Sequence, residues 1–529
     1  DTRQLNASGV IAPGAIEEFD RLLASGAFAG ATRQALDLQR LQPRGALPLL
    51  LQVDVDLCQG RNDAARRLLA KALGSDIDGP HTALRLMQVL DRLSESGLMI
   101  EVAGQLPPPM WGSATQLAQA AHVLTGVGAF ALARQYAHAA VAKDGRNPPA
   151  LYALATLETF YGDLAGAAEL CTRCLAILPD DAGAFWLLSR LRQPGGGVRI
   201  DRLRSLLAAS TSVEDRVWYG YALHNELHEL GDHEASWAAL AEACATKRAL
   251  LGDGIGRYGD LLDALLAAED WPQPAAATPI AAAPVASLRA VFVIGLHRSG
   301  TTLAEQVLAG HPSVAGGGET YDIRAQLRRV TRLHYPHELD TRVIAQRHAI
   351  DFPALGRHYL RGMSWRAEGK PVVTDKLPSN YLNLGLIANA LPDARFIHLR
   401  RDPVDVGFSS LRTLFSHACP YSYDPLDFAR HHHRYQRLMA HWRQRFPDRI
   451  LDVDYDDLVS DPVATATRMA RFVGLDFTPT MVALEQRTNA VATASSVMMR
   501  DGIRRDRGKV WAPYARRLAP MIEALSAPV

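Results

Sequence analysis

The stretch from Val291 to Thr302 constrains the fold more than any other part of the chain. Residues 291–294 are apolar and mostly β-branched or aromatic, a glycine and a short polar turn follow them, and residues 303–308 place apolar side chains at helical spacing. This pattern predicts a buried strand, a tight loop and a helix. Such a loop directs backbone N–H groups and the positive end of the helix toward one point, so we expect a site for a phosphate-like group there.

The spacing of Gly295 and Gly300 matches that of a nucleotide-binding P-loop, but the residues that follow do not. A nucleoside triphosphatase needs a lysine for the terminal phosphates and then a serine or threonine for magnesium. Thr301 and Thr302 stand there instead, and the cation of the loop is Arg298. The loop is therefore predicted to hold a phosphate-like group but not a triphosphate chain. A plain βα turn whose glycines have no ligand is the alternative interpretation.

Length and composition restrict the class of protein. A chain of 529 residues is long enough for two or more domains, and its 48% hydrophobic and 21% charged residues are typical of a soluble globular protein. The net charge of +1 gives no electrostatic case for nucleic acid or an acidic membrane, and no apolar run reaches membrane-spanning length. Residues 1–4 are polar and show no secretory signal, and an odd number of cysteines suits a reducing compartment, so we expect a cytoplasmic location.

Residues 1–271 are predicted to form successive helices, because Ala and Leu recur throughout them. Similar residues stand 34 positions apart, as in Leu117 and Leu151 (151 − 117) or Gly128 and Gly162 (162 − 128). This period resembles that of tetratricopeptide repeats, which stack into a curved solenoid. Two interpretations stay open: a concave surface that holds a peptide or protein, or a scaffold that covers the second half or joins two chains as a homodimer.

A segment rich in Pro and Ala, residues 272–288, is predicted to link the repeat domain to a second domain at residues 289–529. There, short β-branched runs alternate with helical patterns, which predicts an α/β fold with a central parallel sheet and helices on its faces. Ligands of such sheets bind at the carboxyl ends of the strands. The predicted strands are residues 290–294, 372–374, 395–399 and 450–453.

Two charged residues follow turns or strands in this second domain. Glu319 comes after three consecutive glycines, residues 316–318, on a bare backbone that a ligand can approach, and is a candidate general base. Lys376 follows a predicted strand and is a candidate donor to a developing anion. The alternatives are a surface glutamate in a turn and a solvated lysine paired with Asp375.

A second anion site is predicted after the strand at 395–399. That strand ends in two arginines, Asp402 and Pro403 are suited to begin a helix, and Ser409 lies eight residues after Arg401 (409 − 401). An arginine at a strand end and a hydroxyl on the following helix can hold one tetrahedral anion together. The sequence therefore predicts two separate anion sites on one sheet.

In combination, these motifs resemble one family. Residues from about 289 to 529 resemble the sulfotransferases that use 3′-phosphoadenosine 5′-phosphosulfate as sulfuryl donor. With repeats in front, the chain is similar to bacterial tetratricopeptide-repeat sulfotransferases, whose catalytic half is similar to protein-tyrosine sulfotransferases. The motifs that carry the resemblance are residues 298–302, Gly318-Glu319, Asp375-Lys376-x-Pro378, Arg401-Asp402-Pro403 with Ser409, and Tyr455-Asp-Asp-Leu-Val459-x-Asp-Pro462.

The resemblance implies a donor site made of Arg298, Ser299, Gly300, Thr301, Thr302, Arg401, Ser409, Tyr455 and Lys509. Within it, the loop would hold the 5′-phosphosulfate, and Arg401 with Ser409 would hold the 3′-phosphate. The resemblance also implies three catalytic residues. Glu319 would deprotonate the acceptor hydroxyl, Lys376 would stabilise charge on the bridging oxygen, and Ser495 would support the transferring group.

The expected activity is sulfuryl transfer to a hydroxyl, with a tyrosine of a peptide or protein as acceptor and 3′,5′-adenosine bisphosphate as the second product. No metal is required, because Arg298, Lys376 and the helix end can supply positive charge. The alternatives are a small-molecule acceptor (a phenol, sugar or lipid), a P-loop kinase or nucleoside triphosphatase, and a non-catalytic repeat scaffold. The missing P-loop lysine speaks against the kinase.

Overall fold

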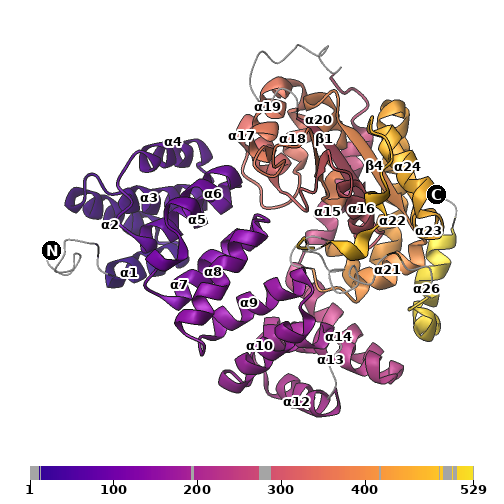
Figure 1. Ribbon diagram of the computed structural model, residues 1–529, viewed down its shortest axis with the longest axis horizontal. Coiled ribbons are helices and arrows are strands. Elements are labelled where there is room, and N and C mark those ends of the chain that lie inside the picture. The colour runs from indigo at the N-terminus through magenta and orange to yellow at the C-terminus, as the bar shows by residue number, and fades with distance from the viewer. Residues whose placement is uncertain are drawn as a thin grey trace. The chain divides into compact units, whose positions relative to one another are not determined.

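The computed structural model of the chain is helical in its first half and mixed α/β in its second (Figure 1). It describes residues 11, 13–191, 196–272, 288–415, 419–487, 489–491, 503 and 509–527. The chain divides into two compact units. The first consists of Asp1–Asp144 and Arg324–Pro336, and the second of Gly145–Ile323 and His337–Val529.

The first unit is helical. Its core is rich in Ala and Leu side chains on the facing sides of consecutive helices and includes the buried aromatic residues Phe19, Trp111 and Tyr136. Its helices are α1 (Pro13–Ala24), α2 (Phe28–Leu41), α3 (Ala46–Cys58), α4 (Asn62–Leu73), α5 (Pro80–Leu93), α6 (Ser96–Gln105), α7 (Ala114–Gly126) and α8 (Phe130–Lys143). Most of α17 (Asp322–Thr331) also belongs here. Arg329 lies 3.6 Å from Glu95, and Arg332 lies 3.4 Å from Asp63.

The second unit begins with seven further helices. They are α9 (Pro148–Tyr161), α10 (Leu164–Ile177), α11 (Ala182–Arg190), α12 (Gly196–Ala209), α13 (Val213–Leu230), α14 (His233–Leu251) and α15 (Gly254–Ala267). Helices α7, α9 and α11 start 34 residues apart (148 − 114 and 182 − 148), and so do α8 and α10 (164 − 130). The helix pairs therefore follow the predicted period, while their assignment to the tetratricopeptide family stays a prediction.

A sheet of five parallel strands forms the centre of the second unit, in the order β2-β3-β1-β4-β5. The strands are β1 (Arg289–Gly295), β2 (Val314–Ala315), β3 (Val372–Asp375), β4 (Arg395–Arg400) and β5 (Ile450–Asp454). The predicted parallel sheet is confirmed, and four strands match the predicted ones to within one residue at each end. The sequence did not predict β2, because two residues are too few to show a periodic pattern.

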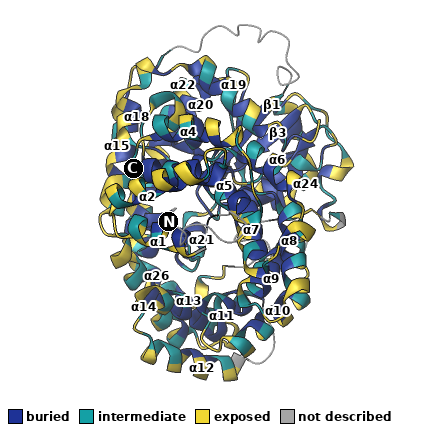
Figure 2. Ribbon diagram, turned by 90° about the vertical axis from the view of Figure 1, so that its left-hand side faces the viewer, coloured by how far each residue is buried: buried dark blue, intermediate teal, exposed yellow. Residues whose placement is uncertain are grey.

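Helices cover both faces of this sheet (Figure 1). The remaining helices of this unit are α16 (Thr301–Ala309), α18 (Thr341–Ala345), α19 (Phe352–Met363), α20 (Leu384–Ala390), α21 (Pro403–Leu411), α22 (Pro425–Arg445), α23 (Tyr455–Ser460), α24 (Pro462–Phe472) and α26 (Ala515–Ser526). Of these, α18 packs on α15, and α26 packs on α21 and α22. On one face, Val293 packs in a cluster with side chains of α16 and α24. On the other, the ring of Phe292 stacks on Phe396 at 5.5 Å and on Tyr359 at 5.6 Å. Burial on both faces explains why the central strand β1 is a continuous apolar run (Figure 2).

The strand register places the ends of three strands together. Phe292 of β1 pairs with Asp375 of β3, and Gly295 of β1 pairs with Leu399 of β4. The loop after Gly295 therefore lies between the segments that follow β3 and β4. Because these are carboxyl ends of parallel strands, this edge is where an α/β sheet binds its ligands.

Helix α15 and Trp271, which precede the predicted linker, pack within the same unit as the sheet. Tyr258 Oη of α15 lies 3.1 Å from Tyr381 Oη, and the rings of Trp271 and Trp442 are 5.3 Å apart. Except for its two ends, the predicted linker lies outside the described residues, so a domain boundary there stays a prediction. Within the part of the chain that the structure describes, no helix combines the length and apolarity needed to cross a membrane.

Replacing Trp271 with Ala should destabilise the sheet unit by about 3–5 kcal/mol, because the ring is buried and its removal leaves a cavity against Trp442. Urea unfolding followed by circular dichroism measures the shift. Leu230→Ala is the matched control, since that side chain is exposed. Equal unfolding midpoints for the two variants would show that Trp271 contributes nothing to the unit that contains the sheet.

Candidate active site

The loop between β1 and α16 has a backbone that its glycines make possible. Gly295 and Gly300 have φ of 153° and 101°, and Arg298 has φ of 73°, which is uncommon for a residue with a side chain. A Cβ at Gly300 would lie 2.4 Å from Cδ2 of Tyr455, and one at Gly295 would lie 2.8 Å from the Leu399 carbonyl oxygen. Both glycines are therefore required by packing as well as by φ.

The second predicted anion site adjoins this loop. Arg298 Nε donates to Ser409 Oγ at 2.9 Å, and Arg401 Nη1 donates to the Arg298 carbonyl oxygen at 3.4 Å. The Arg401 guanidinium lies over the ring of Tyr455, 4.3 Å from its centre. Arg401 and Ser409 both contact Arg298, so the residues of the two predicted anion sites lie next to each other. The carboxylate of Asp405 lies 3.7 Å from Arg401 and balances part of its charge.

The two arginines at the end of β4 have different partners. Arg400 Nη2 lies 2.6 Å from Asp454 Oδ2, and its Nη1 lies 3.5 Å from Asp452. Arg401, the next residue, turns to the loop instead. This alternation is expected at the end of a strand, where successive side chains point to opposite faces. The pair therefore offers a matched comparison between a loop-facing and a carboxylate-bound arginine.

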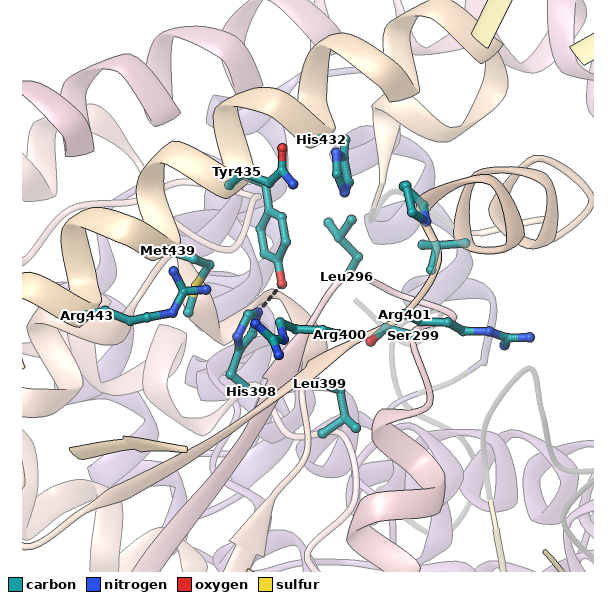
Figure 3. Close-up of a pocket in the computed structure, with 13 residues that line it drawn as sticks. Leu296, Ser299, His398, Leu399, Arg400, Arg401, His432, Tyr435, Met439 and Arg443 are labelled. Atoms are coloured by element: carbon teal, nitrogen blue, oxygen red, sulfur yellow. Dashed lines mark hydrogen bonds between the residues drawn. The ribbon is translucent and has the colours of Figure 1, made fainter. Parts of the chain in front are cut away.

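A cavity of about 260 Å³ lies beside the loop, between the end of β4 and helices α21 and α22 (Figure 3). Ser299 Oγ, Arg401 Nε and His432 Nδ1 belong to residues that line it, and these buried atoms have no hydrogen-bond partner among the described residues. Tyr435 Oη and His398 Nε2 are hydrogen-bonded at its wall (Figure 3). Burial lowers the pKa of His432 to about 4, so this imidazole is neutral at pH 7.

Glu319 and Lys376 form an ion pair, with Nζ 2.5 Å from Oε1. The Lys376 side chain is completely buried, and that of Glu319 is 34% exposed. The interpretation of Lys376 as a solvated lysine paired with Asp375 is therefore wrong. Burial, together with the charges of Lys376 and Arg298, lowers the pKa of His297 to about 4 against the opposing effect of Glu319. The loop and the ion pair thus lie within electrostatic reach of one another.

Asp375, at the end of β3, is a fully buried carboxylate with three hydrogen-bond donors. Thr320 Oγ1 and Tyr359 Oη lie 2.9 Å from its Oδ2, and Asn380 Nδ2 lies 3.1 Å from its Oδ1. Burial raises the pKa of Asp375 to about 7, although the hydrogen bonds from Thr320 and Tyr359 oppose this shift. Asp375 therefore binds Thr320, the residue after Glu319, and is itself the residue before Lys376. It thus connects the two segments that carry the ion pair.

The remaining two predicted site residues come from the C-terminal part of the chain. Ser495 lies outside the described residues. Lys509 is exposed, and its ammonium nitrogen lies 5.5 Å from the centre of the Trp511 ring. No group of three or more His, Cys, Asp or Glu side chains within the described ranges could hold a metal ion.

The sequence analysis assigned no role to Glu305, which the structure places on the buried side of α16. Its Oε1 accepts hydrogen bonds from Gly318 N and Thr374 Oγ1, both at 2.8 Å. One signal was available: Glu305 is four residues after Thr301, so it lies on the helix face that begins at the loop. A glutamate on that face of a buried helix needs partners, and their identity depends on the tertiary structure.

Comparisons with known proteins agree with the resemblance in the second half of the chain. The model of the "Sulfotransferase family" matches residues 290–479, which contain the loop, Glu319, Lys376, Arg401 and Tyr455. The match identifies a sulfotransferase-family domain in the C-terminal half.

Three similar proteins differ in how much of the chain they cover. An uncharacterized protein of Aquifex aeolicus (strain VF5) is 24% identical over 376 residues, which are 69% of this chain and 49% of that protein. The chain thus spans about half the length of this relative. The sulfotransferase domain of the Synechococcus PCC 7002 olefin synthase has a TM-score of 0.32 and 19% identity, covering 49% of this chain and 100% of that domain. Retinol dehydratase, solved with androsterone and the inactive cofactor PAP, has a TM-score of 0.23 and 19% identity, covering 46% of this chain and 82% of that protein.

The raised pKa of Asp375 predicts a specific dependence of stability on pH. Between the ordinary pKa of an aspartate and about 7, the folded state holds a proton that the unfolded state has lost, so stability falls as pH rises. Relative to Asp375→Asn, which cannot ionise, the wild-type protein should lose roughly 3 kcal/mol of unfolding free energy between pH 5 and pH 8. Urea unfolding of both proteins at several pH values measures this. A constant difference across the range would contradict a proton on Asp375.

Proposed function

We propose that the second unit transfers the sulfuryl group of 3′-phosphoadenosine 5′-phosphosulfate to a hydroxyl acceptor. One observation carries this proposal: the glycine loop, the Arg401–Ser409 group and the Glu319–Lys376 ion pair adjoin at the carboxyl edge of one sheet. A donor with two separated phosphate groups needs two anion sites and a base beyond them. The family match over residues 290–479 supports the same activity.

Donor binding is assigned to the loop and to the groups around it. Backbone N–H groups at the start of α16, together with Arg298, would hold the 5′-phosphosulfate. Arg401 and Ser409 would hold the 3′-phosphate, and the ring of Tyr455 would contact the nucleotide. The hydrogen bond between Arg298 and Ser409 would connect the two phosphate sites. Lys509 and Ser495 are proposed to complete the donor site and to support the transferring group.

The chemical step needs one base and one cation. Glu319 accepts the proton of the acceptor hydroxyl as the acceptor oxygen attacks sulfur. The bond between sulfur and the bridging oxygen breaks, its electron pair stays on the phosphate, and Lys376 stabilises that charge. The sulfated acceptor and 3′,5′-adenosine bisphosphate are the products. Because an ammonium group has three N–H donors, Lys376 can contact the bridging oxygen while it remains close to Glu319.

The proposed acceptor is a tyrosine of a peptide or protein. Two features support this choice: the resemblance of the catalytic motifs to protein-tyrosine sulfotransferases, and the helix pairs with a 34-residue period, which we propose are tetratricopeptide repeats. Such repeats form extended surfaces that can hold a peptide. Phenols, sugars and lipids are the other acceptor classes, and parallel assays with labelled donor would distinguish them.

Glu319→Gln should lower sulfuryl transfer to a tyrosine peptide by about 10²–10⁴-fold, because the amide cannot accept the acceptor proton. Incubation with ³⁵S-labelled donor measures transfer, and calorimetry with 3′,5′-adenosine bisphosphate measures nucleotide binding, which should be unchanged. A small phenol, a sugar and a lipid alcohol are assayed in parallel. Full activity of the variant would place the base elsewhere, and labelling of only a small molecule would overturn the peptide acceptor.

Arg401→Met should weaken binding of 3′,5′-adenosine bisphosphate by about 10–100-fold, since a charged hydrogen-bond partner of the 3′-phosphate is lost. Binding of 5′-AMP, which lacks that phosphate, should change much less. Arg400→Met is the matched control, because Arg400 is bound to Asp454. Equal losses for both nucleotides would mean that Arg401 does not recognise the 3′-phosphate.

A further inference from the structure

The residues directly before and after Glu319 in the chain are each hydrogen-bonded to a buried carboxylate. Glu305 holds the glycines before Glu319, and Asp375 holds Thr320 after it. The two carboxylates come from different elements, α16 and β3. Both are buried, whereas Glu319 itself is partly exposed. Glu319, which is partly exposed, therefore lies on a segment that Glu305 and Asp375 fix by hydrogen bonds on both sides of it.

On the first side, Glu305 connects three segments. Its Oε1 accepts from the Gly318 amide and from the Thr374 hydroxyl, both at 2.8 Å. The same hydroxyl oxygen accepts a hydrogen bond from the Gly317 amide at 3.1 Å. A Cβ at Gly317 would lie 2.1 Å from the Thr374 carbonyl oxygen. Gly317 thus allows the chain to approach β3 closely, and Glu305 binds the two amides there directly or through Thr374.

On the second side, Asp375 binds Thr320 and is followed by Lys376. The Lys376 amide donates to the Gly318 carbonyl oxygen at 2.9 Å. Gly318 therefore has both backbone polar groups bound, one to Glu305 and one to Lys376. The distance between the proposed base and its lysine depends on these backbone contacts. A shift of the segment 316–320 would move Glu319 relative to Lys376.

We propose that Glu305 and Asp375 are positioning residues that hold Glu319 at the reacting hydroxyl and beside Lys376. This inference rests on the proposed function of Glu319 as the base. Catalysis is sensitive to such placement, because a shift of about 1 Å in a reacting group can cost about 10²-fold in rate. Neither carboxylate is assigned to donor binding. Replacing either of them should therefore lower kcat and leave the affinity for the nucleotide unchanged.

Glu305→Ala tests the first of these residues. The variant loses the hydrogen bonds from Gly318 and from Thr374, so kcat should fall by about 10–100-fold with unchanged affinity for 3′,5′-adenosine bisphosphate. Glu305→Gln keeps an oxygen that can accept from Gly318 and Thr374, and should recover most of that loss. Hydrogen exchange followed by mass spectrometry should show faster exchange at residues 316–320 in Glu305→Ala alone. Gln306→Leu, at the next position on α16, is the matched control, because Gln306 is also buried and its Oε1 accepts from Arg487 and Asn489 instead.

A double-mutant comparison tests whether Glu305 acts through Glu319. If it does, adding Glu305→Ala to Glu319→Gln should change the residual transfer rate by less than about threefold, because the group being positioned is already inactive. If the fold-loss in transfer rate of the double variant equals the product of the losses of the two single variants, the proposal is overturned. It is also overturned by unchanged kcat in Glu305→Ala, or by a parallel loss of nucleotide affinity. If residual transfer is too slow to measure, the exchange rate and the kcat of the single variants decide.

These results separate the inference from the function on which it rests. If Glu319→Gln is inactive while Glu305→Ala and Asp375→Ala keep the wild-type kcat, only the positioning role is wrong. If Glu319→Gln transfers sulfate at the wild-type rate, the assignment of the base is wrong and the positioning role falls with it. Thr374→Val removes the hydroxyl between Glu305 and Gly317 and should lower kcat in the same direction as Glu305→Ala.

Discussion

Lys376 places an ammonium group where its side chain has no contact with solvent. Removing such a charge from water costs several kcal/mol, and a carboxylate at hydrogen-bonding distance offsets much of that cost. Glu319 supplies the carboxylate, and it remains partly exposed toward solvent. The ion pair therefore presents a carboxylate at the surface of the candidate site and a cation behind it, and the segments that carry the two residues have to stay in register.

The parallel sheet provides that register. Because β1 lies between β3 and β4, the loop after Gly295 is flanked by the segment that carries Lys376 and by the one that carries Arg401. Arg298 joins the loop to the second of these segments, since it contacts Ser409 through its side chain and Arg401 through its carbonyl oxygen. Phosphate recognition and proton transfer are thereby proposed to occur at neighbouring strand ends.

Much of this fold followed from local patterns. Four strands and the strand–loop–helix around Gly300 were predicted from apolar runs and glycine spacing, because neighbouring residues determine these features. The pairings were not predictable in the same way. Lys376 and Glu319 are 57 residues apart, and Thr374 and Glu305 are 69 apart. A buried glutamate such as Glu305 shows no local signal of its partners, so the sequence analysis gave it no role.

By itself, the sequence determined where four of the five strands and the glycine loop occur and that the first half is helical, because hydrophobic period and backbone preference are properties of short stretches. It also indicated which residue types could hold two phosphate groups. Only the tertiary structure decided which charges meet, that Lys376 is buried against Glu319 instead of solvated beside Asp375, and that Trp271 packs in the unit that contains the sheet. These outcomes depend on the order of strands and on burial, which bring together residues that no spacing in the chain connects.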